Sequence, residues 1–189
     1  MVDKKFVHAC CFTGHRPERL EMPPKKVIHW LNEQIDNAIS DGYTTFISGM
    51  QRGVDIWAAE AVVNKIKEGA NVNLVAACAF KGMEDCWERN WQDRYRVLLE
   101  AASEIHYIGD NPGRAAFFER DEWMVDHAGR LIGVYTGAPG GTLKTINYGK
   151  KKGLEVILID EKLCDRDNAK KMVDRVKKGY PKAYEELGK

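Results

Sequence analysis

The chain has 189 residues, of which 44% are hydrophobic and 30% charged, and this supports one hydrophobic core but hardly a second. Its 29 Lys and Arg residues are balanced by 28 Asp and Glu residues, which argues against nucleic acid as a partner. No apolar run is long enough to span a membrane, and five cysteines without a C-x-x-C pair suit a reducing compartment. We therefore expect one cytoplasmic domain over residues 1–189, without a membrane partner.

Strand-like and helix-like segments alternate along the chain. An apolar stretch at residues 6–12 predicts a strand, and a helix follows the Pro23-Pro24 start signal. The alternation continues with predicted strands at 44–48, 72–80, 105–108, 131–135 and 156–159, and predicted helices at 54–67, 84–102 and 115–128. This pattern is typical of parallel βαβ units, so we expect a Rossmann-like, three-layer, doubly wound α/β fold with a mostly parallel sheet. A closing helix is expected at about residues 165–179.

Three loops that directly follow predicted strands form the candidate ligand site. Ligands of open parallel sheets bind beyond the carboxyl ends of the strands, so these loops should converge on one pocket. Glycines allow the backbone to approach a ligand, and the helices that follow offer free N–H groups to a phosphate. The candidate residues are Thr13, Gly14, His15 and Arg16 in the first loop, Ser48, Gly49, Gly53 and Asp55 in the second, and Gly137, Gly140, Gly141 and Thr142 in the third.

Each of these loops also has a purely structural interpretation. The second loop is neither a P-loop nor a G-x-G-x-x-G turn, and its glycines could simply make a tight turn between strand and helix. His15 and Arg16 could reach a phosphate or carboxylate, whereas Arg16 could instead pair with an acidic neighbour on the surface.

Two further clusters have open alternatives. Trp87, Trp91 and Tyr95 lie at helical spacing, where they could pack in the core or a dimer interface, or wall a pocket and stack a base. Arg120 lies in a charged helix that could be a solvated face. No H-E-x-x-H pattern or paired Cys/His set is present, so we expect no metal.

The combination of motifs resembles a known superfamily. Ser-Gly-Met-Gln-Arg-Gly-Val-Asp at 48–55 resembles the S-G-x-x-x-G-[IV]-D signature of the DprA/Smf proteins. Gly-His-Arg-Pro at 14–17, Trp-Ala-Ala-Glu at 57–60 and Trp-Met-Val-Asp at 123–126 are similar to the YpsA-type proteins of unknown function, the DUF1273 group. Both groups belong to the SLOG superfamily, and the resemblance implies a Rossmann-like domain that binds a nucleotide or nucleotide-derived ligand.

One position departs from the related LOG phosphoribohydrolases. Their pattern is an R-x-x-x-M helix followed by P-G-G-x-G-T-x-x-E, and Arg120, Met124, Gly141 and Thr142 match it. Where that pattern has its carboxylate, this chain has Thr145, which can neither stabilise an oxocarbenium-like centre nor activate water well. Glu119, Asp55 or Glu84 could substitute, but spacing selects none of them.

The resemblance implies a ligand-binding module that senses a nucleotide, with Arg120 and Thr145 completing the three loops. The cofactor expectation is a nucleotide or an ADP-ribose- or NAD-like ligand. Two alternatives are a nucleotide N-glycosidase with a relocated carboxylate and a DprA-like binder of single-stranded DNA. Five tryptophans would allow a homodimer through an aromatic interface. If Arg120 points into an open pocket, its removal should barely change stability.

Overall fold

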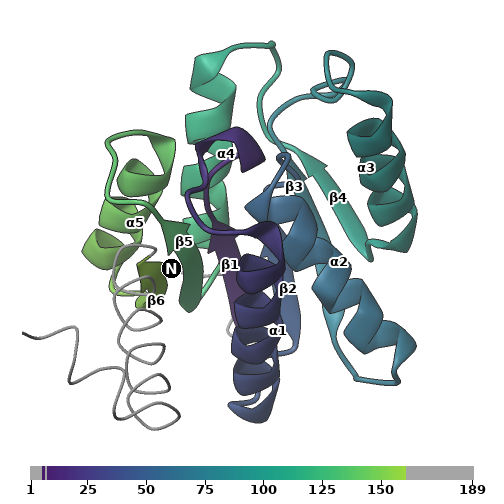
Figure 1. The fold of residues 1–189 in the computed structure, drawn as a ribbon, viewed down its shortest axis with the longest axis vertical. Helices are drawn as coiled ribbons and strands as arrows, with labels where there is room; N and C mark the ends of the chain where they lie inside the picture. The colour runs from purple at the N-terminus through teal and green to yellow at the C-terminus, as the bar shows by residue number, and fades with distance from the viewer. Residues whose placement is uncertain (1–5, 7, 161–189) are drawn as a thin grey trace, which may run out of the picture.

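A computed structural model describes residue 6 and residues 8–160 of the chain (Figure 1). In this part, six strands form one sheet: β1 (Ala9–Thr13), β2 (Thr45–Ser48), β3 (Asn73–Cys78), β4 (Glu104–Tyr107), β5 (Arg130–Tyr135) and β6 (Glu155–Asp160). The helices are α1 (Pro24–Ser40), α2 (Val54–Lys67), α3 (Arg89–Ala101), α4 (Arg114–Asp126) and α5 (Gly141–Lys152), with a 3-10 helix at Pro17–Arg19. The closing helix expected at 165–179 lies outside the described residues.

The strand order is β4-β3-β2-β1-β5-β6, and every neighbouring pair is parallel. From β1 the chain first adds strands toward β4 and then returns to the other side of β1 for β5. The strand order therefore reverses between β1 and β5, which is where ligands bind in doubly wound folds. The predicted Rossmann-like α/β class is confirmed.

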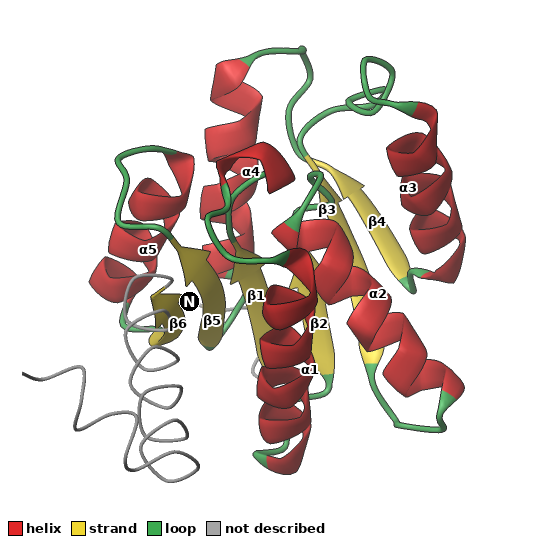
Figure 2. Ribbon diagram, viewed as in Figure 1, coloured by secondary structure: helices red, strands yellow, loops and turns green. Residues whose placement is uncertain are grey.

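Helices cover both faces of the sheet, with α1, α2 and α3 on one side and α4 and α5 on the other (Figure 2). The alternation of strand side chains produces the two cores. Cys10 and Phe12 of β1 face the core under α1 to α3, whereas Ala9 and Cys11 face the core under α4 and α5. Within the described residues, every helix is too short or too polar to cross a bilayer.

The helix predicted at 84–102 is five residues shorter at its start. Turns occupy residues 81–86, and α3 begins only at Arg89, after Glu88 in an extended conformation. Trp87 therefore precedes the helix, yet its ring still packs edge-on against buried Tyr95, with 5.6 Å between centroids. Trp91 lies 6.1 Å from Trp57. These aromatic side chains pack against the core, as the first of the alternatives for them predicts.

Candidate functional site

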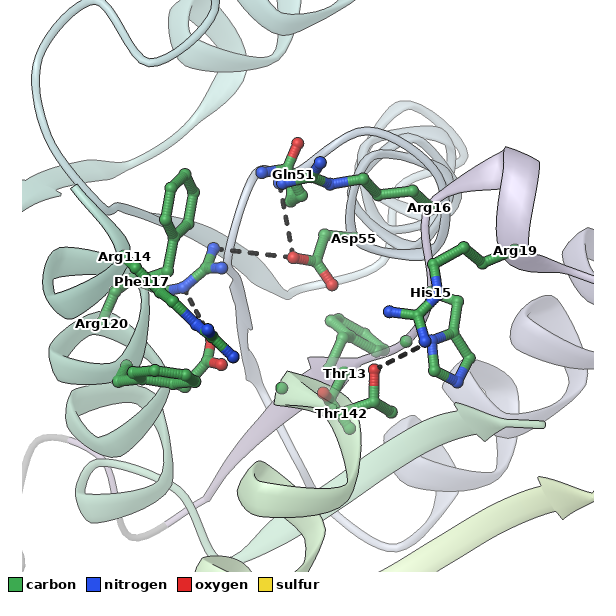
Figure 3. A pocket seen from close by; sticks show the side chains of 15 residues that line it. Thr13, His15, Arg16, Arg19, Gln51, Asp55, Arg114, Phe117, Arg120 and Thr142 are labelled. Carbon is green, nitrogen blue, oxygen red and sulfur yellow. Dashed lines mark hydrogen bonds and ion pairs between the residues drawn. The ribbon is translucent and has the colours of Figure 1, made fainter. Parts of the chain in front are cut away.

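A cavity of about 310 Å³ opens at the carboxyl ends of β1 and β5, where the strand order reverses (Figure 3). Its walls come from the loop after β1, the start of α2, one face of α4 and the start of α5. The lining residues are Phe12, Thr13, Gly14, His15, Arg16, Arg19, Gln51, Asp55, Arg114, Phe117, Phe118, Arg120, Asp121, Gly141 and Thr142. Residues from each of the three predicted loop regions therefore border this one cavity.

Arg120 lies at the centre of a buried charge cluster. Its guanidinium donates a hydrogen bond to the Gly49 carbonyl, and its Nε lies 2.9 Å from Asp121 Oδ1. Its Nη1 also lies 3.6 Å from Asp55 Oδ2, and only 4% of Arg120 is exposed. The alternative of a solvated helix face is therefore wrong for Arg120. Its charge is shared between two carboxylates of the protein itself, so the premise that it points freely into an open pocket is also wrong.

The Asp55 carboxyl has an unusual proton affinity. Burial raises its pKa to about 7, and the charge of Asp121 adds to this, while Arg120 and the Gln51 N–H oppose it. The Gln51 N–H lies 3.4 Å from Asp55 Oδ2. A carboxyl that exchanges its proton near neutral pH is suited to acid-base chemistry.

Three other cavity arginines have no ion-pair partner in the described part of the chain. Arg16, Arg19 and Arg114 are exposed around the cavity, and none forms an ion pair with a described carboxylate. Arg114 stacks over the ring of Phe118, with 5.5 Å between its Cζ and the ring centroid. The cavity therefore offers free positive charge beside an aromatic wall.

The start of α5 supplies backbone donors to the same cavity. Gly140 precedes the helix and Gly141 is its first residue, so the first N–H groups of α5 have no partner within the helix. A Cβ placed on Gly141 would meet no atom within 4 Å, which shows that this glycine borders open space. This is the geometry in which helix N-termini bind anions.

Six predicted residues do not line the cavity but build its surroundings. The Ser48 hydroxyl donates to the Asp55 carbonyl, and a Cβ on Gly49 would collide with Arg120. Gly53, with φ of 93°, brings the start of α2 against the His15 carbonyl, while Gly137 and Gly140 form the turn before α5. Thr145 is buried one turn into α5, with its hydroxyl 3.0 Å from Asp121 Oδ2.

Sequence reasoning missed most of the α4 wall. Arg114, Phe117, Phe118 and Asp121 lie at i, i+3, i+4 and i+7, a spacing that places them on one helical face, and this signal could have found them. Arg19 and Gln51 were missed as well. Three carboxylates were considered as replacements for the acid of the LOG pattern. Of these, only Asp55 lines the cavity, whereas Glu119 is exposed and Glu84 lies in the turns before α3. In the described part of the chain, no group of three or more His, Cys, Asp or Glu side chains could hold a metal ion.

The fold and the cavity define a Rossmann-like domain with a site at its topological switch point. The family model YpsA, described as the YspA SLOG family, matches residues 10–156, and the chain belongs to this family.

Named relatives agree with this assignment. YoqJ, an uncharacterized SPbeta prophage-derived protein of Bacillus subtilis, is 30% identical over 118 residues, which cover 56% of this chain and 69% of YoqJ. A UPF0398 protein of Brevibacillus brevis is 26% identical over 125 residues, and the match covers 65% of this chain and 62% of that protein.

Solved structures share the fold. DNA processing protein A of Helicobacter pylori, whose structure describes a single-stranded DNA binding mode, has a TM-score of 0.57 at 14% identity, with 95% of this chain and 86% of that chain covered. DNA processing protein A of Streptococcus pneumoniae has a TM-score of 0.54 at 15% identity, and the match covers 82% of this chain and 50% of that chain.

Proposed function

We propose that this protein is a binding module for a phosphorylated nucleotide derivative, held in the cavity between β1, α4 and α5. The observation that carries the proposal is a set of three arginines, Arg16, Arg19 and Arg114, which have no carboxylate partner among the described residues and lie beside the N-terminus of α5. The net charge of the whole chain is only +1, so these three arginines are a local cluster and not part of a generally basic protein.

Each part of such a ligand has a matching group. Guanidinium groups bind phosphate through charge-assisted hydrogen bonds, each contributing about 1.5 to 3 kcal/mol. The Gly140-Gly141 turn lets a phosphate approach the α5 N–H groups. Phe117 and Phe118 line the cavity and supply apolar surface against which a base can pack, and a volume of about 310 Å³ is at the small end of ligand pockets.

The test is a thermal-shift and calorimetry series with adenosine, AMP, ADP, ADP-ribose and NAD. Ligand at a hundredfold excess over Kd should stabilise the protein by about 2.7 kcal/mol, and phosphate-bearing compounds should exceed adenosine. Arg19→Ala should weaken binding by roughly ten- to a hundredfold. Arg89→Ala, whose side chain is 92% exposed on α3, is the matched control and should bind normally. Equal binding by adenosine and ADP would refute the phosphate role.

A second candidate, cleavage of an N-glycosidic bond, rests on the two carboxylates beside Arg120. Protonated Asp55 could deliver a proton to the departing base, while Asp121 accepts a proton from the water that attacks the anomeric carbon. The reaction would release free base and ribose 5-phosphate from AMP. Base release that Asp121→Asn abolishes would make the protein an enzyme, whereas binding without release would leave it a sensor.

The DNA-binding mode of the Helicobacter relative is a separate alternative. The balanced charge of this chain argues against it. A salt-dependent mobility shift with single-stranded DNA, lost in Arg16→Ala, would favour DNA over a small ligand.

The expectations of a cytoplasmic location and of a homodimer stay predictions. Cell fractionation would test the location, and sedimentation would test the oligomeric state.

A further inference from the structure

His15 connects two of the cavity loops through both of its ring nitrogens. Only 3% of the residue is exposed. On one side, the Thr136 N–H and hydroxyl lie 3.4 and 3.1 Å from Nε2. On the other side, the Thr142 hydroxyl oxygen lies 3.4 Å from Nδ1 (Figure 3). His15 therefore bridges the end of β5 and the first turn of α5.

The backbone N–H of Thr136 decides which ring nitrogen carries the proton. A backbone N–H can only donate, so Nε2 must present a lone pair to it. The ring is then neutral, and its proton is on Nδ1, from which it points to Thr142 Oγ1. Burial, with a smaller contribution from the charge of Arg19, lowers the pKa of His15, which favours the same neutral ring at neutral pH.

This proton position determines what Thr142 can offer to the cavity. When Thr142 Oγ1 accepts from His15, its own proton is free to be donated elsewhere. With the opposite tautomer, Thr142 would donate to the ring and present only lone pairs to the cavity. Because phosphate oxygens are acceptors, only the first arrangement is complementary to them.

We propose that His15 is a positioning residue, which holds Thr142 as a hydrogen-bond donor toward an anionic oxygen of the ligand. This inference rests on the proposed binding of a phosphorylated ligand. It adds that the first loop acts on that ligand through Thr142. Through Thr142, His15 thereby favours a ligand that presents a hydrogen-bond acceptor, and not a donor, to the start of α5.

The first test needs no ligand. Long-range proton-nitrogen NMR spectra at pH 7.5, assigned by comparison with His15→Gln, report the state of each ring nitrogen. The expected result is a protonated Nδ1 and an unprotonated Nε2. A protonated Nε2, or a doubly protonated ring, would overturn the proposal.

The second test measures ADP affinity by calorimetry. Thr142→Val should weaken binding roughly ten- to a hundredfold, whereas Thr142→Ser should retain it. His15→Asn can still place an amide N–H toward Thr142 and should retain most of the affinity. His15→Gln places its amide nearer the Nε2 position and should lose as much as Thr142→Val.

The double variant separates positioning from general damage. His15→Gln combined with Thr142→Val should be no weaker than either single variant, because both act through one hydrogen bond. Additive losses would overturn the proposal. If the unmodified protein binds none of AMP, ADP, ADP-ribose and NAD, the proposed nucleotide function fails, while the NMR result still decides the state of His15.

Discussion

The hydroxyl of Thr145 on α5 donates a hydrogen bond to Asp121 on α4 beside the cavity, with 3.0 Å between Thr145 Oγ1 and Asp121 Oδ2. In the LOG pattern, the position of Thr145 carries the carboxylate, and the sequence left Glu119, Asp55 and Glu84 as its possible replacements. The structure supplies a carboxylate from the neighbouring helix within hydrogen-bond distance of that position. Asp121, a residue that the motif comparison does not mark, therefore stands beside the position where the LOG pattern has its acid.

Replacing Gly141 tests the phosphate position. Since a Cβ at Gly141 meets no protein atom within 4 Å, Gly141→Val should keep the free energy of unfolding within about 1 kcal/mol of the unmodified protein. Its side chain would occupy space beside the α5 N–H groups and abolish ADP binding. Denaturant melts and calorimetry measure the two effects. Gly141→Ala should be intermediate, and full binding by the valine variant would exclude a phosphate there.

Arg120→Ala should destabilise the fold. The side chain is 4% exposed and lies between Asp55 and Asp121, so its removal leaves two carboxylates without their cation. Breaking a buried pair of this kind costs about 3 to 5 kcal/mol. Urea unfolding of Arg120→Ala at pH 7.5 measures the loss, and Arg114→Ala, an exposed cavity arginine, is the control. A change below about 1 kcal/mol would contradict the buried cluster.

The periodicity of the sequence was sufficient for the fold but not for the inside of the site. Short apolar segments that alternate with helical patterns identified the strands. The rule that ligands bind beyond the carboxyl ends of parallel strands led to the three loops around the cavity. The contacts of Arg120 with Gly49 and Asp55 could not be predicted, because these two residues come from the β2–α2 segment, which only the folded sheet brings against α4. The sequence also does not distinguish a glycine that borders the cavity from one that the packing requires. Gly141 borders the cavity, whereas Gly49 leaves space for the Arg120 guanidinium.

The raised pKa of Asp55 predicts a specific pH dependence of stability. Between its ordinary value of 3.8 and about 7, the folded protein holds a proton that the unfolded chain has lost. Stability from this group is therefore complete below pH 3.8 and is lost as pH rises to about 7. Asp55→Asn cannot titrate, so its stability relative to the unmodified protein should improve on going from pH 4 to pH 8, by roughly 1 to 4 kcal/mol.

Parallel urea titrations of both proteins at several pH values give this difference directly. Titrations shared by the two proteins cancel when one curve is subtracted from the other. A constant difference across the range would show that Asp55 has an ordinary pKa, and a difference of the opposite sign would mean that Arg120 dominates over burial.

Thr145→Glu introduces the carboxylate of the LOG pattern and separates the two candidate functions. Thr145 is 3% exposed and already touches Asp121, so the new carboxylate would lie against an existing one. Desolvation and like-charge repulsion should lower stability by roughly 2 to 4 kcal/mol, measured by urea unfolding. Thr145→Gln, of nearly the same size but neutral, is the control and should lose less.

Base release from AMP by the same variants completes the comparison. If the native protein is a sensor, it releases no base above background, and Thr145→Glu gains release only where its carboxylate reaches the anomeric carbon. If Asp121 has taken over the catalytic role, the native protein already releases base. Thr145→Glu should then be slower, because the substitution removes the hydroxyl that contacts Asp121 and places a second negative charge against it. Faster release of base by Thr145→Glu than by the native protein would exclude Asp121 as the carboxylate that replaces the one in the LOG pattern.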